Sequence, residues 1–220
     1  MKDNSRLMLA ALSLLTVSTG LIDAATVLGS SVFAANMTGN LVFLGFSLGG
    51  SSDYSVPSSL AAIFGFLLGA FVAGRLIRDK LTARKAGLAL GIQTVFILLG
   101  AGLAWLTKAG ESDSWGRWLM LILLGVAMGL QNTVSIKKSA LDDMKTTVMT
   151  LTLAGMAADL GRGKTDKLGV RLFSVLLLVV GAVTGALIYY SAGLVATILA
   201  TALCVGLTAA LFAVGEEEKV

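Results

Sequence analysis

The chain has 220 residues, of which 56% are hydrophobic and 14% are charged, and its formal net charge is +4. Soluble globular domains carry about 25% charged residues, so this composition predicts an integral membrane protein and excludes an ordinary soluble domain. The sequence contains no histidine and a single cysteine, Cys204. This excludes an intramolecular disulfide and histidine-based metal or general-base sites, and we expect no cofactor and no metal.

A membrane-spanning helix needs about 17 to 25 apolar residues. Six segments reach that length, and they are residues 7–28, 56–74, 86–107, 118–136, 172–190 and 192–214. Two further stretches, 31–50 and 146–158, are interrupted by polar residues or are short for a full crossing. We therefore predict an all-α membrane protein with six transmembrane helices and two extra polar segments that are re-entrant or partial.

The positions of the basic residues predict the topology. Fifteen of the seventeen lysines and arginines lie in five segments that share one side if only the six long segments span. Positive residues are retained in the cytoplasm, so both termini are predicted there. All tryptophans and tyrosines fall on the opposite side, at the depth that these rings prefer. The positive balance is then explained without a nucleic-acid partner.

An internal repeat relates the two halves of the chain. Residues 20–24 align with residues 129–133 at an offset of 109, and Met37-Thr38 then falls on Thr146-Thr147. Each half has three spans, so we predict that residues 1–110 and 111–220 form two inverted repeats within one transmembrane domain. Inverted repeats are common in secondary transporters, whose binding sites lie where the halves meet. The alternative is an old duplication that now serves only structure.

Polar residues within predicted spans are candidate site residues, because burying them in hydrocarbon is costly. Asp23 is the one formally charged residue in the six spans, and its counterpart in the repeat is Asn132, next to Gln131. Asp23 is predicted to couple a proton or cation, or to hold a cationic substrate. The alternative is a carboxylate near the outer end of its helix that faces water.

The two extra segments supply the remaining candidates for a polar path. The first contributes Asn36, Thr38 and Asn40, and the second contributes Thr146 and Thr147. Their amides and hydroxyls are neutral donors and acceptors suited to a re-entrant segment that lines a cavity. For the threonines of the second segment, the alternative is that they bond to their own helix or join neighbouring helices.

Two other patterns concern packing and gating. Glycines four residues apart occur at 65/69, 87/91, 125/129 and 181/185 and predict close helix packing. The cytoplasmic segment 74–85 contains Arg75 and Asp79, which we interpret as a gating clasp. This segment resembles a glycine, aspartate and basic-cluster signature of major facilitator transporters, but simple retention of positive charge is the alternative.

Together, residues 20–24, 36–41, 129–132 and 146–160 resemble the YoaK-like family of bacterial inner-membrane proteins, also called domain of unknown function 1275. The resemblance covers nearly the whole chain and implies a six-span bacterial inner-membrane protein without an assigned substrate. The family often has a histidine before its Met-Thr-Gly-Asn core, where this chain has Asn36.

These patterns predict a small secondary transporter or exporter of a small polar or cationic solute, coupled to protons through Asp23. Six helices enclose only a narrow path, so we also expect a homodimer in the lipid bilayer. One alternative is a passive channel with two re-entrant segments, and another is a non-transporting subunit of a larger complex. An enzyme is not expected, because the chain lacks histidine and no span holds two acidic residues.

Overall fold

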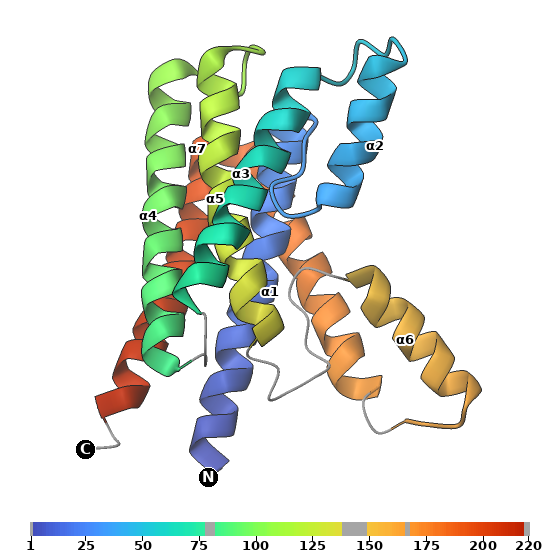
Figure 1. The fold of residues 1–220 in the computed structure, drawn as a ribbon, viewed down its shortest axis with the longest axis vertical. Coiled ribbons are helices and arrows are strands. Elements are labelled where there is room, and N and C mark those ends of the chain that lie inside the picture. The colour runs from blue at the N-terminus through green and yellow to red at the C-terminus, as the bar shows by residue number, and fades with distance from the viewer. Residues whose placement is uncertain (1, 78–81, 138–148, 166–167, 218–220) are drawn as a thin grey trace.

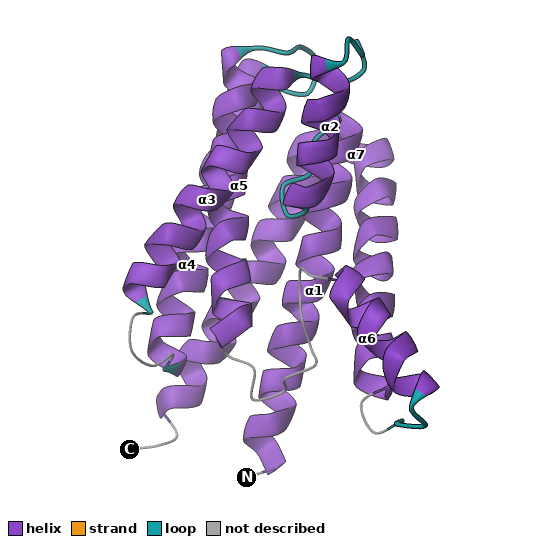
Figure 2. Ribbon diagram, turned by 45° about the vertical axis from the view of Figure 1, so that its right-hand side comes forward, coloured by secondary structure: helices purple, strands orange, loops and turns teal. Residues whose placement is uncertain are grey.

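The computed structural model describes residues 2–77, 82–137, 149–165 and 168–217. Within these residues every regular element is a helix, as Figure 2 shows. The helices are α1 (Lys2–Ser30), α2 (Met37–Leu48), α3 (Val56–Leu76), α4 (Ala83–Thr107), α5 (Trp115–Lys137), α6 (Met149–Gly161) and α7 (Leu168–Glu217).

Five of these helices, α1, α3, α4, α5 and α7, are long and apolar enough to cross a membrane. They contain all six predicted spanning segments, so the prediction of an all-α, multi-pass membrane protein is confirmed. The last two predicted spans lie together in α7, whose 50 residues would extend about 75 Å if the helix were straight. That length is more than twice the hydrocarbon thickness of about 30 Å.

A break at Gly193 divides α7 into two arms, residues 168–192 and 194–217. Gly193 has φ 84° and ψ −178°, a conformation that only glycine adopts without strain. In Figure 1 the orange first arm rises from the lower end and the red second arm returns to it. The first arm packs on α1, where Gly181 meets Val17, and the second packs on α4, where Gly206 meets Thr94.

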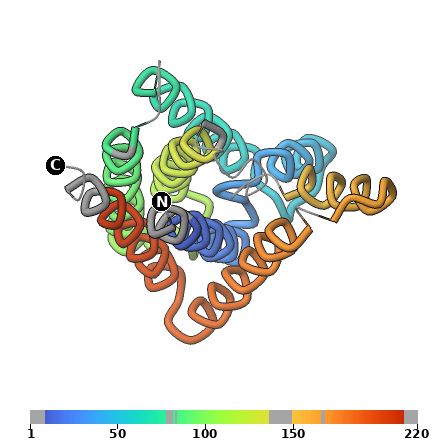
Figure 3. The backbone as a smooth tube through the Cα atoms, turned by 90° about the horizontal axis from the view of Figure 1, so that it is seen from below, coloured from blue at the N-terminus to red at the C-terminus, as the bar shows by residue number. Residues whose placement is uncertain are grey.

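α1 and α5 form the centre of the bundle. In α1 and α5, 61% of the most apolar 18-residue stretch is buried inside the protein, against 39% or less in α3, α4 and α7. Figure 3, viewed from below, shows α1 and α5 enclosed by the other helices. Polar groups on α1 and α5 therefore face protein on most sides, which makes these two helices the natural place for a site.

The two extra polar segments form the short helices α2 and α6. α2 has 12 residues, so it is about 18 Å long and too short to cross a membrane, and the described part of α6 has 13 residues. Figure 1 shows α2 beside the upper half of the bundle and α6 beside the lower half. α2 begins where the Asn36 side chain accepts a hydrogen bond from the Gly39 amide at 3.3 Å.

Close helix packing at the glycine pairs is confirmed with one exception. A Cβ at Gly69 or Gly129 would meet backbone atoms of the facing helix, because α3 and α5 touch there without intervening side chains. Gly20 and Gly181 make the same kind of contact between α1 and α7. The prediction is wrong at Gly91. No heavy atom of another element lies within 4 Å of a Cβ built there, so no helix packs closely on this residue.

The two ends of the molecule differ in composition. Both termini lie at the lower end in Figure 1, as do the end of α3, the start of α4 and the end of α6 with their basic residues. The helix ends and turns at the upper end carry the aromatic residues Tyr54, Trp105, Trp115, Trp118, Tyr189 and Tyr190. The expected separation of basic and aromatic residues is therefore present along the long axis.

A hydrogen-bonded cluster around Asp113 joins the start of α3 to the start of α5 at the upper end. Its carboxylate accepts hydrogen bonds from the Ser55 and Ser58 hydroxyls and from the Trp118 indole, the last at 2.8 Å. Partial burial opposes ionisation of Asp113, but these bonds and the nearby Arg117 outweigh it and lower the pKa of the carboxyl.

Candidate functional site

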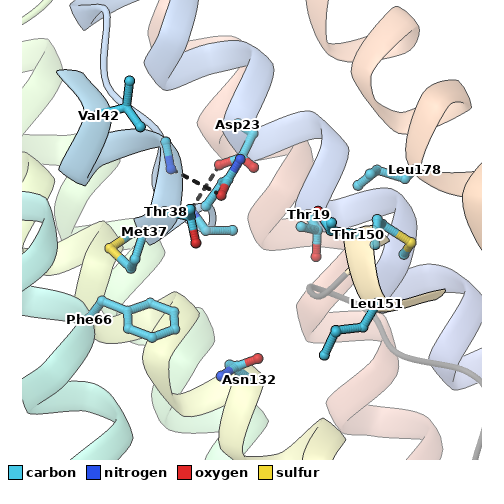
Figure 4. A pocket seen from close by; sticks show the side chains of 14 residues that line it. Thr19, Asp23, Met37, Thr38, Val42, Phe66, Asn132, Thr150, Leu151 and Leu178 are labelled. Carbon is cyan, nitrogen blue, oxygen red and sulfur yellow. Dashed lines mark hydrogen bonds between the residues drawn. The ribbon is translucent and has the colours of Figure 1, made fainter. Parts of the chain in front are cut away.

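A cavity of about 570 Å³ lies where α1, α2, α3, α5, α6 and α7 approach one another. Its size is within the usual range for small-molecule sites. Figure 4 shows its walls. They are formed by Thr19, Asp23, Ala35, Asn36, Met37, Thr38, Gly39, Val42, Phe66, Asn132, Met149, Thr150, Leu151 and Leu178.

Asp23 supplies the carboxylate of this cavity. It lies on α1 seven residues before the helix ends at Ser30, or about 10 Å from that end. Its Oδ1 accepts a hydrogen bond from the Ala35 amide at 2.8 Å. Asp23 lines the cavity, and its hydrogen bond from Ala35 also holds the loop of residues 31–36 that leads into α2.

The start of α2 forms the wall next to Asp23. Asn36 and Thr38 are exposed and line the cavity. Asn40 does not line it. Its Oδ1 accepts from the Phe33 amide at 2.8 Å and its Nδ2 donates to the Phe33 carbonyl at 2.7 Å. The fully buried Asn40 therefore fixes the loop and is not part of the cavity wall.

The opposite wall comes from the second half of the chain. Figure 4 shows Asn132 of α5 and Leu151 of α6 across the cavity from Asp23. Met149 and Thr150, the first described residues of α6, complete this wall. Asp23 and Asn132, which the predicted repeat aligns, thus face one space from opposite sides.

Gln131 lies in a buried network beside the cavity and does not line it. Its Oε1 accepts from Gln93 Nε2 at 2.6 Å, and its Nε2 donates to Thr19 Oγ1 at 2.9 Å and to the Leu15 carbonyl at 3.0 Å. These bonds join α1, α4 and α5 at a fully buried position. The structure therefore assigns Gln131 to holding the helices that carry Asp23 and Asn132.

The remaining predicted residues lie away from the cavity or outside the described residues. Arg75, in the last turn of α3, lies over the Phe71 ring at 4.8 Å and lines neither cavity described for this chain. Asp79, Thr146 and Thr147 lie outside the described residues.

An ion pair at the lower end joins α6 to α7. Arg171 and Asp159 are 2.7 Å apart, and their side chains are 15% and 27% exposed. α6 has its main described helix contact with α7. This pair is therefore a principal attachment of the helix that forms one wall of the cavity.

Several residues of the site were missed by the sequence reasoning. Thr19 lies four residues before Asp23, so both project from one face of α1, a spacing visible in the sequence. Gln93 was detectable as a polar residue inside a predicted span. Phe66 and Leu178 carry no such signal, because apolar residues that face a cavity look the same in sequence as those that face lipid.

The cavity combines one carboxylate with neutral amide and hydroxyl groups and with the apolar side chains of Phe66 and Leu178. A carboxylate binds a cationic group or a proton, and the neutral groups exchange hydrogen bonds with a polar solute. This set of groups is suited to a small polar or cationic molecule.

Comparison with known proteins identifies similar sequences. The family model described as "Protein of unknown function (DUF1275)" matches residues 11–210. The chain is 31% identical over 153 residues to the "UPF0700 transmembrane protein YoaK" of Bacillus subtilis (strain 168), a match that covers 68% of this chain and 65% of that protein. No solved structure gives a significant match.

Proposed function

Because the chain belongs to the DUF1275 family, whose description assigns no function, we propose a function from its site: a small secondary transporter or exporter of a small polar or cationic solute. One observation carries the proposal. Asp23 and Asn132, from the two halves of the chain, face a common cavity of about 570 Å³ within the bundle. Secondary transporters bind their solutes between two repeats near the middle of the membrane.

Two inverted repeats of three spans each account for the packing. α1 and α5, which begin the two halves, run in opposite directions in Figure 1. A Cβ on Gly20 of α1 would lie 2.8 Å from Gly181, and one on the aligned Gly129 of α5 would lie 3.1 Å from Gly69. Each half thus packs its first span against the second span of the other, which is the reciprocal contact that a two-fold axis in the membrane plane requires.

Asp23 is proposed to couple protons to movement of α2. An ionised carboxylate accepts the Ala35 hydrogen bond strongly, whereas a protonated one is a weaker acceptor. Proton binding would therefore loosen the loop before α2 and alter the wall of the cavity next to Asn36 and Thr38. Asn132, which faces Asp23 across the cavity, is neutral, so Asp23 is the titratable member of this pair.

The lower end, with both termini and the basic helix ends, is proposed to face the cytoplasm of a bacterial inner membrane, in accordance with the positive-inside rule. A homodimer is proposed because six helices enclose a narrow path. Mass measurement in nanodiscs tests the dimer, and a mass equal to one chain plus the disc contradicts it.

The function is tested by a thermal-shift screen of polar and cationic solutes on the purified protein, followed by uptake of the hits into proteoliposomes with and without a pH gradient. Asp23→Asn is the informative variant, because a carboxamide oxygen still accepts from Ala35 but does not titrate. Asp53→Asn, in the exposed upper loop, is the matched control.

Coupled transport predicts solute uptake that follows the pH gradient in the wild type and in Asp53→Asn, and loss of that dependence in Asp23→Asn. Uptake that ignores the gradient and is unchanged by Asp23→Asn identifies a passive channel instead. No uptake of any hit, with a stoichiometric partner that co-purifies, identifies a subunit of a larger complex.

A further inference from the structure

A second cavity, of about 630 Å³, lies at the upper end of the molecule between the end of α4 and the Gly193 turn of α7. Its residues are Ala104, Trp105, Lys108, Gly110, Glu111, Tyr189, Ala192, Gly193, Leu194 and Val195. None of them lines the cavity that contains Asp23. This second cavity therefore needs its own explanation.

The cavity is bounded by an ordered turn. Lys108 ends α4 in the left-handed conformation with φ 49°, and the Glu111 amide donates to the Lys108 carbonyl at 2.9 Å. Arg117 holds the same turn from α5, with its Nε donating to the Ala109 carbonyl at 2.8 Å. Lys108 and Glu111 thus lie on one hydrogen-bonded turn, and both line the same cavity.

The cavity presents two opposite charges, those of Lys108 and Glu111, which no ion pair joins to each other or to another described residue. Among the described residues, neither the Lys108 ammonium nor the Glu111 carboxylate has a hydrogen-bond or ion-pair partner, and both side chains are exposed. A cavity with one free cation and one free anion is complementary to a zwitterion.

The surroundings place this charge pair at the level of lipid head groups. Trp105, which is 71% exposed, and Tyr189 line the cavity, and such rings concentrate at the membrane interface. The Tyr189 hydroxyl donates to the Leu28 carbonyl at 3.2 Å, which holds this ring against α1. Below the cavity the two helices expose the leucines Leu98, Leu99, Leu199 and Leu203.

We propose that this cavity binds the head group of a phosphatidylethanolamine molecule from the membrane leaflet at the upper end. Lys108 contacts the phosphate, and Glu111 accepts hydrogen bonds from the primary ammonium. The acyl chains run along the exposed leucines of α4 and of the second arm of α7. A primary ammonium has three donors, as in lysine, whereas the quaternary ammonium of phosphatidylcholine has none. An anionic lipid such as phosphatidylglycerol leaves Glu111 without a partner.

The test uses the full-length protein purified in detergent, to which defined phospholipids are added. Thermal stability and native mass spectrometry are measured with phosphatidylethanolamine, phosphatidylcholine, phosphatidylglycerol and soluble glycerophosphoethanolamine. The variants are Lys108→Gln, Glu111→Gln and their combination, and Lys164→Gln at the exposed lower end is the matched control. The substituted side chains are exposed, so the variants should have the same melting temperature as the wild type when no lipid is added.

We expect phosphatidylethanolamine to raise the melting temperature most and to remain bound in the wild type and in Lys164→Gln. Each cavity variant should weaken phosphatidylethanolamine binding by about twofold to fivefold, as expected for one charge contact near the surface. Equal effects of phosphatidylethanolamine and phosphatidylcholine, or a preference that persists in the double variant, overturn the proposal. A soluble head group that acts as strongly as the lipid overturns the assignment to a membrane lipid. Neither outcome depends on whether the protein transports a solute.

Discussion

The contact between α3 and α5 at Gly129 has a measurable consequence. A Cβ added at Gly129 would collide with the Phe66 carbonyl and would lie 2.7 Å from the Ala70 nitrogen and 3.1 Å from the Gly69 carbonyl carbon. Ordinary van der Waals contacts of a Cβ are 3.4 to 4 Å. These neighbours are backbone atoms of α3, so no rotation of a side chain relieves the collision.

The size of the effect of Gly129→Ala follows from this geometry. Restoring ordinary contact with Ala70 alone, from 2.7 to 3.4 Å, requires a helix displacement of about 0.7 Å. Overpacking costs about 1–3 kcal/mol, and the upper part of that range applies because the obstacle is backbone. Alanine regains about 0.8–1.0 kcal/mol of helix propensity over glycine. We therefore expect a net destabilisation of about 1–2 kcal/mol.

The assay is thermal unfolding in detergent, followed by tryptophan fluorescence. A destabilisation of about 1–2 kcal/mol corresponds to a fall in melting temperature of about 2–8 °C for a chain of this size. Gly91→Ala is the matched control, since Gly91 is also within a spanning helix but has nothing within 4 Å of an added Cβ. It should leave the melting temperature unchanged or raise it through helix propensity.

A Gly129→Ala protein as stable as Gly91→Ala would refute the packing argument, because the two sites differ in the neighbours of the added methyl. Gly20→Ala extends the test to the other half of the chain. An added Cβ there would meet the Leu178 carbonyl and lie 2.5 Å from the Ala182 nitrogen, so it should be destabilising to a similar extent. A neutral Gly20→Ala would contradict the proposed equivalence of the two halves.

Three further predictions concern polar contacts. Gln131→Leu should destabilise the bundle by about 1–3 kcal/mol in chemical or thermal unfolding, since it strips partners from buried groups on two other helices, and an unchanged stability would contradict this. The lowered pKa of Asp113 means that its stabilising contribution is complete above the ordinary carboxyl pKa and is lost as the pH falls through the folded value, so stability should fall below about pH 4. Asp113→Asn should reduce this loss of stability below about pH 4. If Asp113→Asn loses as much stability at low pH as the wild type, other carboxyl groups cause the loss. Arg171→Gln should break the ion pair with Asp159 and speed amide hydrogen exchange in α6 about fivefold, whereas unchanged exchange would mean that other contacts hold this helix.

The spanning helices were predictable from sequence because hydrocarbon selects for long apolar segments independently of what they pack against. Each predicted span lies within a helix of the structure, including the two that form the arms of α7 on either side of Gly193. The short length of α2 likewise follows from polar residues that interrupt its apolar run. These features depend on the local composition of the chain alone.

The roles of individual polar residues were less predictable. Asn36, Thr38 and Asn40 are close in sequence, yet the first two line the cavity and the third is buried against Phe33. Gln131 and Asn132 are neighbours, yet only Asn132 reaches the cavity. Adjacent helical residues point about 100° apart, and the packing of the whole helix decides which of them meets a cavity.

The amino-acid sequence by itself determined that this protein lies in a membrane, which segments form its long apolar helices, and which end of the molecule is basic and which carries the tryptophans and tyrosines. Those properties come from the transfer of each segment between water and lipid, which depends on composition alone. The tertiary structure decided that Asp23 and Asn132 share one cavity and that Gln131 holds the helices around it. A hydrogen bond between residues 112 positions apart, such as that of Gln131 with Thr19, forms only when packing brings the two helices together.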